Sequence, residues 1–210
     1  MSTWRAMVRL PEPIKIADTM PFADYLIRQH EIADAQEVWT AMARISPSLR
    51  PSTSDANLIV NGSFDEEIIP GGFSWHLEPP ATKSLQLDDR ELHTGTASAA
   101  FNFEGPSFLD FGFYQLVPVK PNQLYELRFD SKSQEIVSGA GPRITVDDAF
   151  THTNLAQGSE WIGTHPWGEQ SFLFTTKPDT HLLRIYVGRS PGAGLIRGKL
   201  WLDNIKMYER

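Results

Sequence analysis

Hydrophobic and polar residues follow two different patterns along this chain. Residues 21–46 repeat apolar positions every three or four residues, a spacing that predicts amphipathic helices. From Asn57 onward, apolar and polar residues alternate one by one, as in strands that bury one face. We therefore expect a helical part over residues 1–50, a linker rich in Pro and Ser over residues 51–56, and a β domain over residues 57–210.

The helical part is predicted to be a hairpin. Phe22, Tyr25 and Leu26 share one face of the first helix, and Pro47 ends the second. A very short connection between two helices makes them antiparallel. The apolar stripe of the second helix consists of Ile32, Ala35, Val38, Trp39, Met42 and Ile45.

The string YLIRQHEIADAQEVWTAMARISP resembles the end of a tetratricopeptide unit, with an aromatic and Leu in the first helix and a closing proline. One such unit cannot bury its own apolar face, and arrays normally need about three. Two arrangements stay open. Either the hairpin docks on the β domain, or this chain is the end of a longer helical array that could bind a protein partner.

The second part is predicted to be an antiparallel β-sandwich. Its alternation is clearest in Tyr125, Leu127 and Phe129, whose neighbours in sequence are charged. Many short strands with no intervening helix are typical of a sandwich. The expected strands are residues 57–60, 73–77, 84–87, 97–103, 111–119, 124–130, 143–147, 170–175, 182–187 and 199–207.

An ordered set of strings in this β part resembles the jelly-roll carbohydrate-binding modules, which are galactose-binding-like, that are appended to xylanases and related glycanases. The strings are NLIVNGSFD, GFSW, HTGTAS, FYQLVPV, PNQLYEL, FLFT and LWLDNI. The resemblance implies a mainly β jelly-roll that binds sugar without catalysis and often carries one structural calcium ion. Together with the helical hairpin, the chain is also similar to bacterial repeat proteins that end in such a sandwich.

Asp203 is the most informative polar residue of the last predicted strand. By strand periodicity, Trp201, Asp203, Ile205 and Met207 share one face, so an acid is expected on an apolar surface. A buried carboxylate is costly unless it is neutralised, hydrogen-bonded or bound to a cation. Two explanations stay open: a calcium ion, or backbone N–H groups that donate to Asp203 without a metal.

The resemblance implies a calcium site at this position. It places ligands at Asp203 and at Asp65, the acid that follows the Asn-Gly-x-Phe string, and backbone carbonyls near Ser63 and Gly95 would complete the oxygen shell. The commoner pattern has glutamate where this chain has Asp65. The side chain of Asp65 is one methylene shorter than glutamate and so extends less far toward the ion.

Aromatic rings are the expected platform for sugar, because a pyranose has an apolar face of C–H groups that a ring can cover. The predicted ligand-binding residues are Trp161, Tyr114, Trp75, Gln115, Arg143 and Asp147. Trp161 belongs to an expected long loop, residues 148–168, and the alternative is that it only folds this loop onto the domain. Trp167 and Trp201 are interpreted as core residues.

Composition narrows the classes of partner. The chain carries 19 Lys and Arg against 26 Asp and Glu, a formal charge of −7. This balance counts against binding to a nucleic-acid backbone and against a polybasic membrane contact. Without Cys, disulfides, thiolate metal sites and cysteine nucleophiles are excluded.

Targeting signals are not apparent in the sequence. The first 20 residues do not resemble a signal peptide, and no apolar run is long enough to span a bilayer, so we expect a soluble protein. The compartment stays open. A place outside the bacterial cytoplasm follows if the chain is part of a longer exported protein.

Catalytic motifs do not stand out either. No Gly-x-Ser-x-Gly string occurs, and the acid doublets, such as Asp147-Asp148, point to opposite faces of a strand. We therefore expect a non-catalytic binding module, with carbohydrate as the leading ligand. The alternative is a structural or protein-interaction module of the cell envelope, and a glycan-active enzyme is the third hypothesis.

Overall fold

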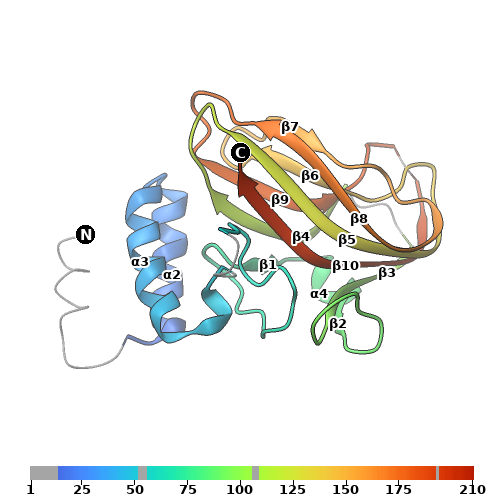
Figure 1. The fold of residues 1–210 in the computed structure, drawn as a ribbon, viewed down its shortest axis with the longest axis horizontal. Helices are drawn as coiled ribbons and strands as arrows, with labels where there is room; N and C mark the ends of the chain where they lie inside the picture. The colour runs from blue at the N-terminus through green and yellow to red at the C-terminus, as the bar shows by residue number, and fades with distance from the viewer. Residues whose placement is uncertain (1–13, 52–55, 106–108, 193) are drawn as a thin grey trace.

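Two antiparallel β-sheets pack face to face, and a pair of helices lies beside one end of them (Figure 1). The computed structural model describes residues 14–51, 56–105, 109–192 and 194–210. The helical elements are α2 (Ile16–Arg28), α3 (Ile32–Ile45), a short 3-10 helix (Pro47–Leu49) and the single turn α4 (Ala81–Ser84). The predicted linker falls mostly on residues 52–55, outside the described residues.

Within the described residues, each sheet has five strands. The first, here the β4–β9 sheet, has the order β1 (Trp75–Leu77), β4 (Asp110–Pro118), β9 (Leu182–Gly188), β6 (Arg143–Asp148) and β7 (Asn154–Gln157). The second, the β5–β10 sheet, has the order β2 (Leu85–Asp88), β3 (Ser98–Gly105), β10 (Ile196–Glu209), β5 (Leu124–Val137) and β8 (Gly163–Thr175). Every pairing is antiparallel, which confirms the predicted mainly β sandwich.

Two local expectations were wrong. The segment predicted as a long loop, residues 148–168, contains β7 and the first part of β8. Residues 57–60 do not form a strand, but Leu58 donates its N–H to the carbonyl of Met207, and Ile205 donates to the carbonyl of Gly62. The start of the β domain is therefore fastened to its last strand by single backbone bonds rather than by a ladder.

The core lies between the two sheets and is rich in aromatic residues. Tyr125, Leu127 and Phe129 point into it from β5, as their alternation predicted. Trp75 of β1 stacks on Phe113 of β4 with ring centroids 4.4 Å apart. Burying such large rings supplies much of the hydrophobic stabilisation of a sandwich of this size.

The last strand changes face midway. The register between β10 and β5 shifts between Asp203 and Lys206, and Asn204 has a φ of 53°. Such a β-bulge inserts a residue and reverses the alternation that follows it. Ile205 therefore faces the core, whereas Trp201 and Asp203 lie on the outer side of the β5–β10 sheet, contrary to the single apolar face expected for them.

The hairpin docks on the sandwich through part of the apolar stripe of each helix, whereas Tyr25 and Ile45, which were expected on those stripes, are 50% and 51% exposed. Its buried side chains, which include Trp39 and Met42, form one hydrophobic cluster with Phe73, Leu116 and Leu182 of the β domain. The hairpin is thus docked on the β domain, as in the first of the two arrangements considered, and the longer helical array stays a prediction. Its tetratricopeptide-like character stays a prediction. None of the helices in the described ranges combines the length and the hydropathy that a membrane crossing requires.

Candidate functional site

The outer face of the β4–β9 sheet gathers planar polar side chains. In β9, Leu183, Ile185 and Val187 point into the core, so Arg184 and Tyr186 point outward. The register sets Tyr114 of β4 opposite Tyr186, and His76 of β1 opposite Tyr114. We call the group His76, Tyr114, Arg184 and Tyr186 the tyrosine–arginine face.

These four side chains form one continuous stack. The His76 ring lies parallel to Tyr114, with centroids 4.5 Å apart and planes inclined by 8°. The guanidinium carbon of Arg184 lies 4.2 Å from the centroid of Tyr114 and 4.4 Å from that of Tyr186. A guanidinium over an aromatic ring is attracted to it by the ring quadrupole. Both faces of Tyr114 are thus covered, by His76 and by Arg184.

Acidic side chains hold the polar ends of the stack. The Tyr114 hydroxyl donates to Glu78 over 2.8 Å, and the Tyr186 hydroxyl donates to Asp147 over 3.0 Å. Arg184 pairs with Asp110, with 2.5 Å between nitrogen and oxygen. Because each planar group is fixed at its face and at its polar end, the array is organised before any ligand arrives, which lowers the entropic cost of binding.

Burial keeps the rings of this face uncharged. It raises the pKa of Tyr114, and it raises the pKa of Tyr186 to about 12. Burial also lowers the pKa of His76, against smaller raising effects of the Gly72 carbonyl and the Asp24 carboxylate. At neutral pH the His76 imidazole and the two tyrosine rings are therefore uncharged.

Three of the predicted ligand-binding residues lie on this side of the sheet. Tyr114 belongs to the stack, and Asp147 accepts hydrogen bonds from Tyr186 and from Asn154. Arg143 lies further along β6, where it donates to Glu160 over 2.7 Å and to the Ser190 hydroxyl. The structure thus brings Tyr114 and Asp147 together, with Arg143 beside them on the same face.

The other three predicted ligand-binding residues are buried. Trp161 is 3% exposed, its indole N–H donates to Ser131, and its ring packs edge-on against Phe129. Trp75 is 2% exposed within the aromatic core. As exposed sugar platforms these two predictions were wrong, because a ring enclosed by protein has no face left for a ligand.

Gln115 is also inaccessible. Its side chain is fully buried, and its amide both donates to the carbonyl of Val60 and accepts from the N–H of Val60. The Gln115 amide therefore satisfies the backbone N–H and carbonyl of Val60, as a neighbouring strand would. The prediction that Gln115 contacts a ligand was wrong, because its side chain is buried and has this structural role.

The two tryptophans interpreted as core residues lie on the outer side of the β5–β10 sheet. Trp167 is half-buried and donates its indole N–H to Glu91 over 2.9 Å. Trp201 donates to Asp88 over 3.0 Å and is covered by Lys132, whose nitrogen lies 5.5 Å from the ring centroid. Trp201 is buried as expected, but under polar side chains rather than between the sheets.

The residues implied as calcium ligands meet at one loop. Asp203 is fully buried and accepts N–H bonds from His93 and Thr94, and Asp65 accepts the N–H of Thr96. Gly95 lies between them: a Cβ at this residue would lie 2.0 Å from Asp65 Oδ1. Burial raises the pKa of Asp203, and the nearby Asp65 carboxylate adds to the rise.

This arrangement fits a cation in part. A buried carboxylate with a second carboxylate nearby, as Asp203 has in Asp65, is a setting that a cation can stabilise. The backbone N–H groups already occupy both oxygens of Asp203, Asn204 donating to Oδ1. No cluster of three or more acidic, His or Cys ligands is found among the described residues, and Ser63 is a half-buried turn residue near Asp65. Any ion would therefore depend on backbone carbonyls.

Sequence reasoning missed His76, Arg184 and Tyr186. A signal for the last two was present, because residues between inward-facing Leu183, Ile185 and Val187 must point outward. What the sequence does not contain is the register that sets them against Tyr114. His76 lies on a strand of three residues, too short to show a period.

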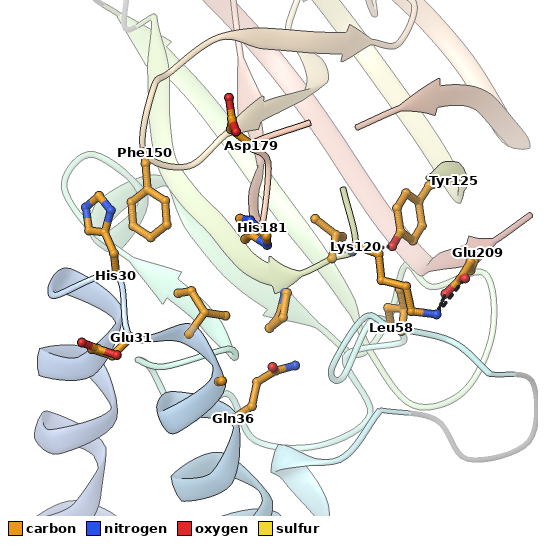
Figure 2. A pocket seen from close by; sticks show the side chains of 14 residues that line it. His30, Glu31, Gln36, Leu58, Lys120, Tyr125, Phe150, Asp179, His181 and Glu209 are labelled. Carbon is orange, nitrogen blue, oxygen red and sulfur yellow. Dashed lines mark hydrogen bonds and ion pairs between the residues drawn. The ribbon is translucent and has the colours of Figure 1, made fainter. Parts of the chain in front are cut away.

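A cavity of about 730 Å³ lies where the hairpin meets the sandwich (Figure 2). On one wall His30 stacks on Phe150 with centroids 3.8 Å apart, and on the other Lys120 is joined to Glu209 over 2.9 Å. Its polar side chains His30, Glu31 and His181 are exposed. Hydrogen bonds and an ion pair fix more of the polar groups on the tyrosine–arginine face than in this cavity.

Comparisons with known proteins show which solved structures have a similar fold. A scan of protein-family models and a search of curated proteins give no match. Among solved structures, a CBM4 structure is similar with a TM-score of 0.53 and 17% identity, over 72% of this chain and 99% of that chain. TmCBM61 in complex with β-1,4-galactotriose gives a TM-score of 0.53 and 18% identity, over 73% and 99%.

A Family 16 Carbohydrate Binding Module is similar as well, with a TM-score of 0.50 and 20% identity, over 73% of this chain and all of that chain. At such identities the likeness concerns the fold. The β domain therefore has the jelly-roll sandwich fold that these carbohydrate-binding modules also have.

Proposed function

We propose that this chain is a non-catalytic carbohydrate-binding module and that its tyrosine–arginine face binds a glycan. The observation that carries the proposal is the stack of His76, Tyr114, Arg184 and Tyr186 on an outward sheet face. The jelly-roll fold supports it, because similar sandwiches include TmCBM61 solved with a galactotriose.

The chemistry of the face suits a sugar in a particular way. Because His76 and Arg184 cover both sides of Tyr114, a sugar meets the polar edges of the stack rather than the flat face of Tyr114. Carboxylates and guanidinium groups form hydrogen bonds with hydroxyls that are stronger than those between neutral groups. Affinity is then expected chiefly from hydrogen bonds, with apolar contact at the free sides of the stack.

The charge of the face favours a neutral glycan. Glu78, Asp110 and Asp147 lie around Arg184, and the other cation on this side, Arg143, is already paired with Glu160. A polyuronate would bring further carboxylates against this group, and like charges in partly buried surroundings repel. We therefore propose a neutral polysaccharide or oligosaccharide as the ligand.

The same contacts argue against turnover. Each of the three acids accepts a hydrogen bond from a tyrosine hydroxyl or pairs with Arg184. Glycoside hydrolysis needs one acid that donates a proton and another that attacks or activates water. Acids fixed in this way act as acceptors that orient hydroxyl groups. A protein-interaction module is the weaker alternative, because the sandwich covers most of the apolar stripes of the hairpin and leaves only Tyr25 and Ile45 of these described stripes exposed.

Affinity electrophoresis tests the proposal directly. We expect at least one neutral polysaccharide, from a panel of galactan, xylan, mannan and mixed-linkage glucan, to retard the chain, whereas polygalacturonate does not. Binding at a single shallow site is expected to be weak, in the range of about −4 to −8 kcal/mol. No retardation by any neutral polysaccharide would overturn the proposed function.

We also propose a structural calcium ion held by Asp65, Asp203 and backbone carbonyls near Ser63 and Gly95. The support is the convergence of the two acids on one loop and the raised pKa of Asp203. A bound ion stabilises the native state by mass action. Adding millimolar calcium is expected to raise the melting temperature and EDTA to lower it, and Asp203→Asn should remove the response. An identical melting temperature with calcium and with EDTA would contradict the ion and mean that backbone N–H groups alone stabilise the Asp203 carboxylate.

A further inference from the structure

The hairpin reaches the tyrosine–arginine face through the turn before β1. Asp24 on α2 accepts the N–H of Gly72 over 2.6 Å. The carbonyl oxygen of Gly72 lies 3.0 Å from Nε2 of His76, the first member of the stack. Three contacts therefore connect a helix carboxylate to Tyr114, on which His76 lies.

This turn has little freedom to move. Gly71 and Gly72 have φ angles of 117° and 56°, which side chains rarely adopt. A Cβ at Gly72 would lie 2.7 Å from the Trp39 ring, and a Cβ at Gly71 would lie 2.8 Å from Met20. Side chains of both helices thus pack directly on the backbone of the turn. The position of the Gly72 carbonyl is set by the hairpin.

The Gly72 carbonyl decides which tautomer His76 adopts. A carbonyl oxygen only accepts, so Nε2 must carry the hydrogen, and in a neutral ring Nδ1 is then an acceptor. No hydrogen bond to Nδ1 is found among the described residues. The charged and titratable groups around the ring are Asp24, Glu78, Arg184 and Tyr114. A sugar hydroxyl can donate to this nitrogen.

We propose that Asp24 is a positioning residue for the ligand site, because it holds Gly72 and through it keeps His76 in the tautomer whose Nδ1 accepts a hydrogen bond from the glycan. This inference rests on the proposed function. It makes the hairpin part of the binding unit rather than a separate module, since the residue that orients His76 belongs to α2.

Two variants of the full chain test the link. Asp24→Ala removes the acceptor for Gly72, whereas Asp24→Asn keeps an oxygen that can accept the same N–H. Asp18→Ala is the matched control, an exposed aspartate six residues earlier on α2. The readouts are the imidazole nitrogen shifts of His76 in NMR spectra and the affinity for the neutral glycan that retards the wild type.

For Asp24→Ala we expect a mixture of His76 tautomers and an affinity about three- to tenfold lower, as for the loss of one hydrogen bond. Asp24→Asn and Asp18→Ala should keep both the tautomer and the affinity. If Asp24→Ala does not fold, Asp24→Ser is used, because its side chain is too short to reach Gly72.

Unchanged His76 signals in folded Asp24→Ala overturn the inference. A changed tautomer with unaltered affinity overturns it too, since His76 then takes no part in binding. If the wild type binds no glycan at all, the proposed function fails by itself. The NMR readout still decides in that case whether Asp24 sets the state of His76.

Discussion

Trp161→Ala is expected to destabilise the fold by about 3–5 kcal/mol, the usual cost of removing a large buried aromatic side chain. Trp161 is enclosed beside Phe129, and its indole N–H is the donor to the buried Ser131 hydroxyl. The variant therefore loses packing and a hydrogen bond together. Denaturant unfolding followed by circular dichroism measures the loss.

Trp167→Ala is the matched control for this prediction. Trp167 is half-buried on the outer side of the β5–β10 sheet, so its removal should cost less than half as much stability. A Trp161→Ala protein that unfolds at the wild-type denaturant concentration, yet no longer binds glycan, would contradict the buried placement of Trp161. It would restore this residue as a ligand platform.

Arg184→Ala is expected to weaken glycan binding more than any other single truncation on the tyrosine–arginine face, by at least about tenfold, or about 1.4 kcal/mol. The guanidinium separates Tyr114 from Tyr186 and balances Asp110. Without it, Tyr114 and Tyr186 lose the group that packs against both rings, and Asp110 loses its ion-pair partner. Isothermal titration with the retarding glycan measures the change.

Arg184→Lys sharpens this test. A lysine keeps the charge but lacks the planar group that stacks on the two rings, so we expect it to restore only part of the affinity. Arg210→Ala is the control, because Arg210 lies 5.4 Å from the ring of Tyr208 on the other sheet. Equal losses for Arg184→Ala and Arg210→Ala would place the ligand elsewhere.

Local periodicity was enough to predict the strands and much of the candidate site. The alternation of Tyr125, Leu127 and Phe129 marked a half-buried strand, and the structure has them in the core. The same rule places Tyr114 and Asp147 on outward positions, because the side chains of a strand alternate whatever its partners are. Information of this kind is carried by neighbouring residues.

Aromatic identity alone did not predict accessibility. Trp75 and Trp161 are as large and apolar as any sugar platform, but they are buried because strands from distant parts of the chain close over them. Burial is decided by which segments pack together, and the type of a single residue does not indicate this. Tyr114 differs only because its strand position points away from the core.

The sequence by itself determined the helical hairpin, the succession of strands and the side to which most of their residues point, since these depend on spacing along the chain. Only the tertiary structure decided the register that joins Tyr114 to Tyr186, the bulge that puts Ile205 in the core while Asp203 lies on the outer side, and the contact of Asp24 with Gly72. Those features depend on residues far apart in sequence. Their geometry follows from packing the whole domain, which no local pattern encodes.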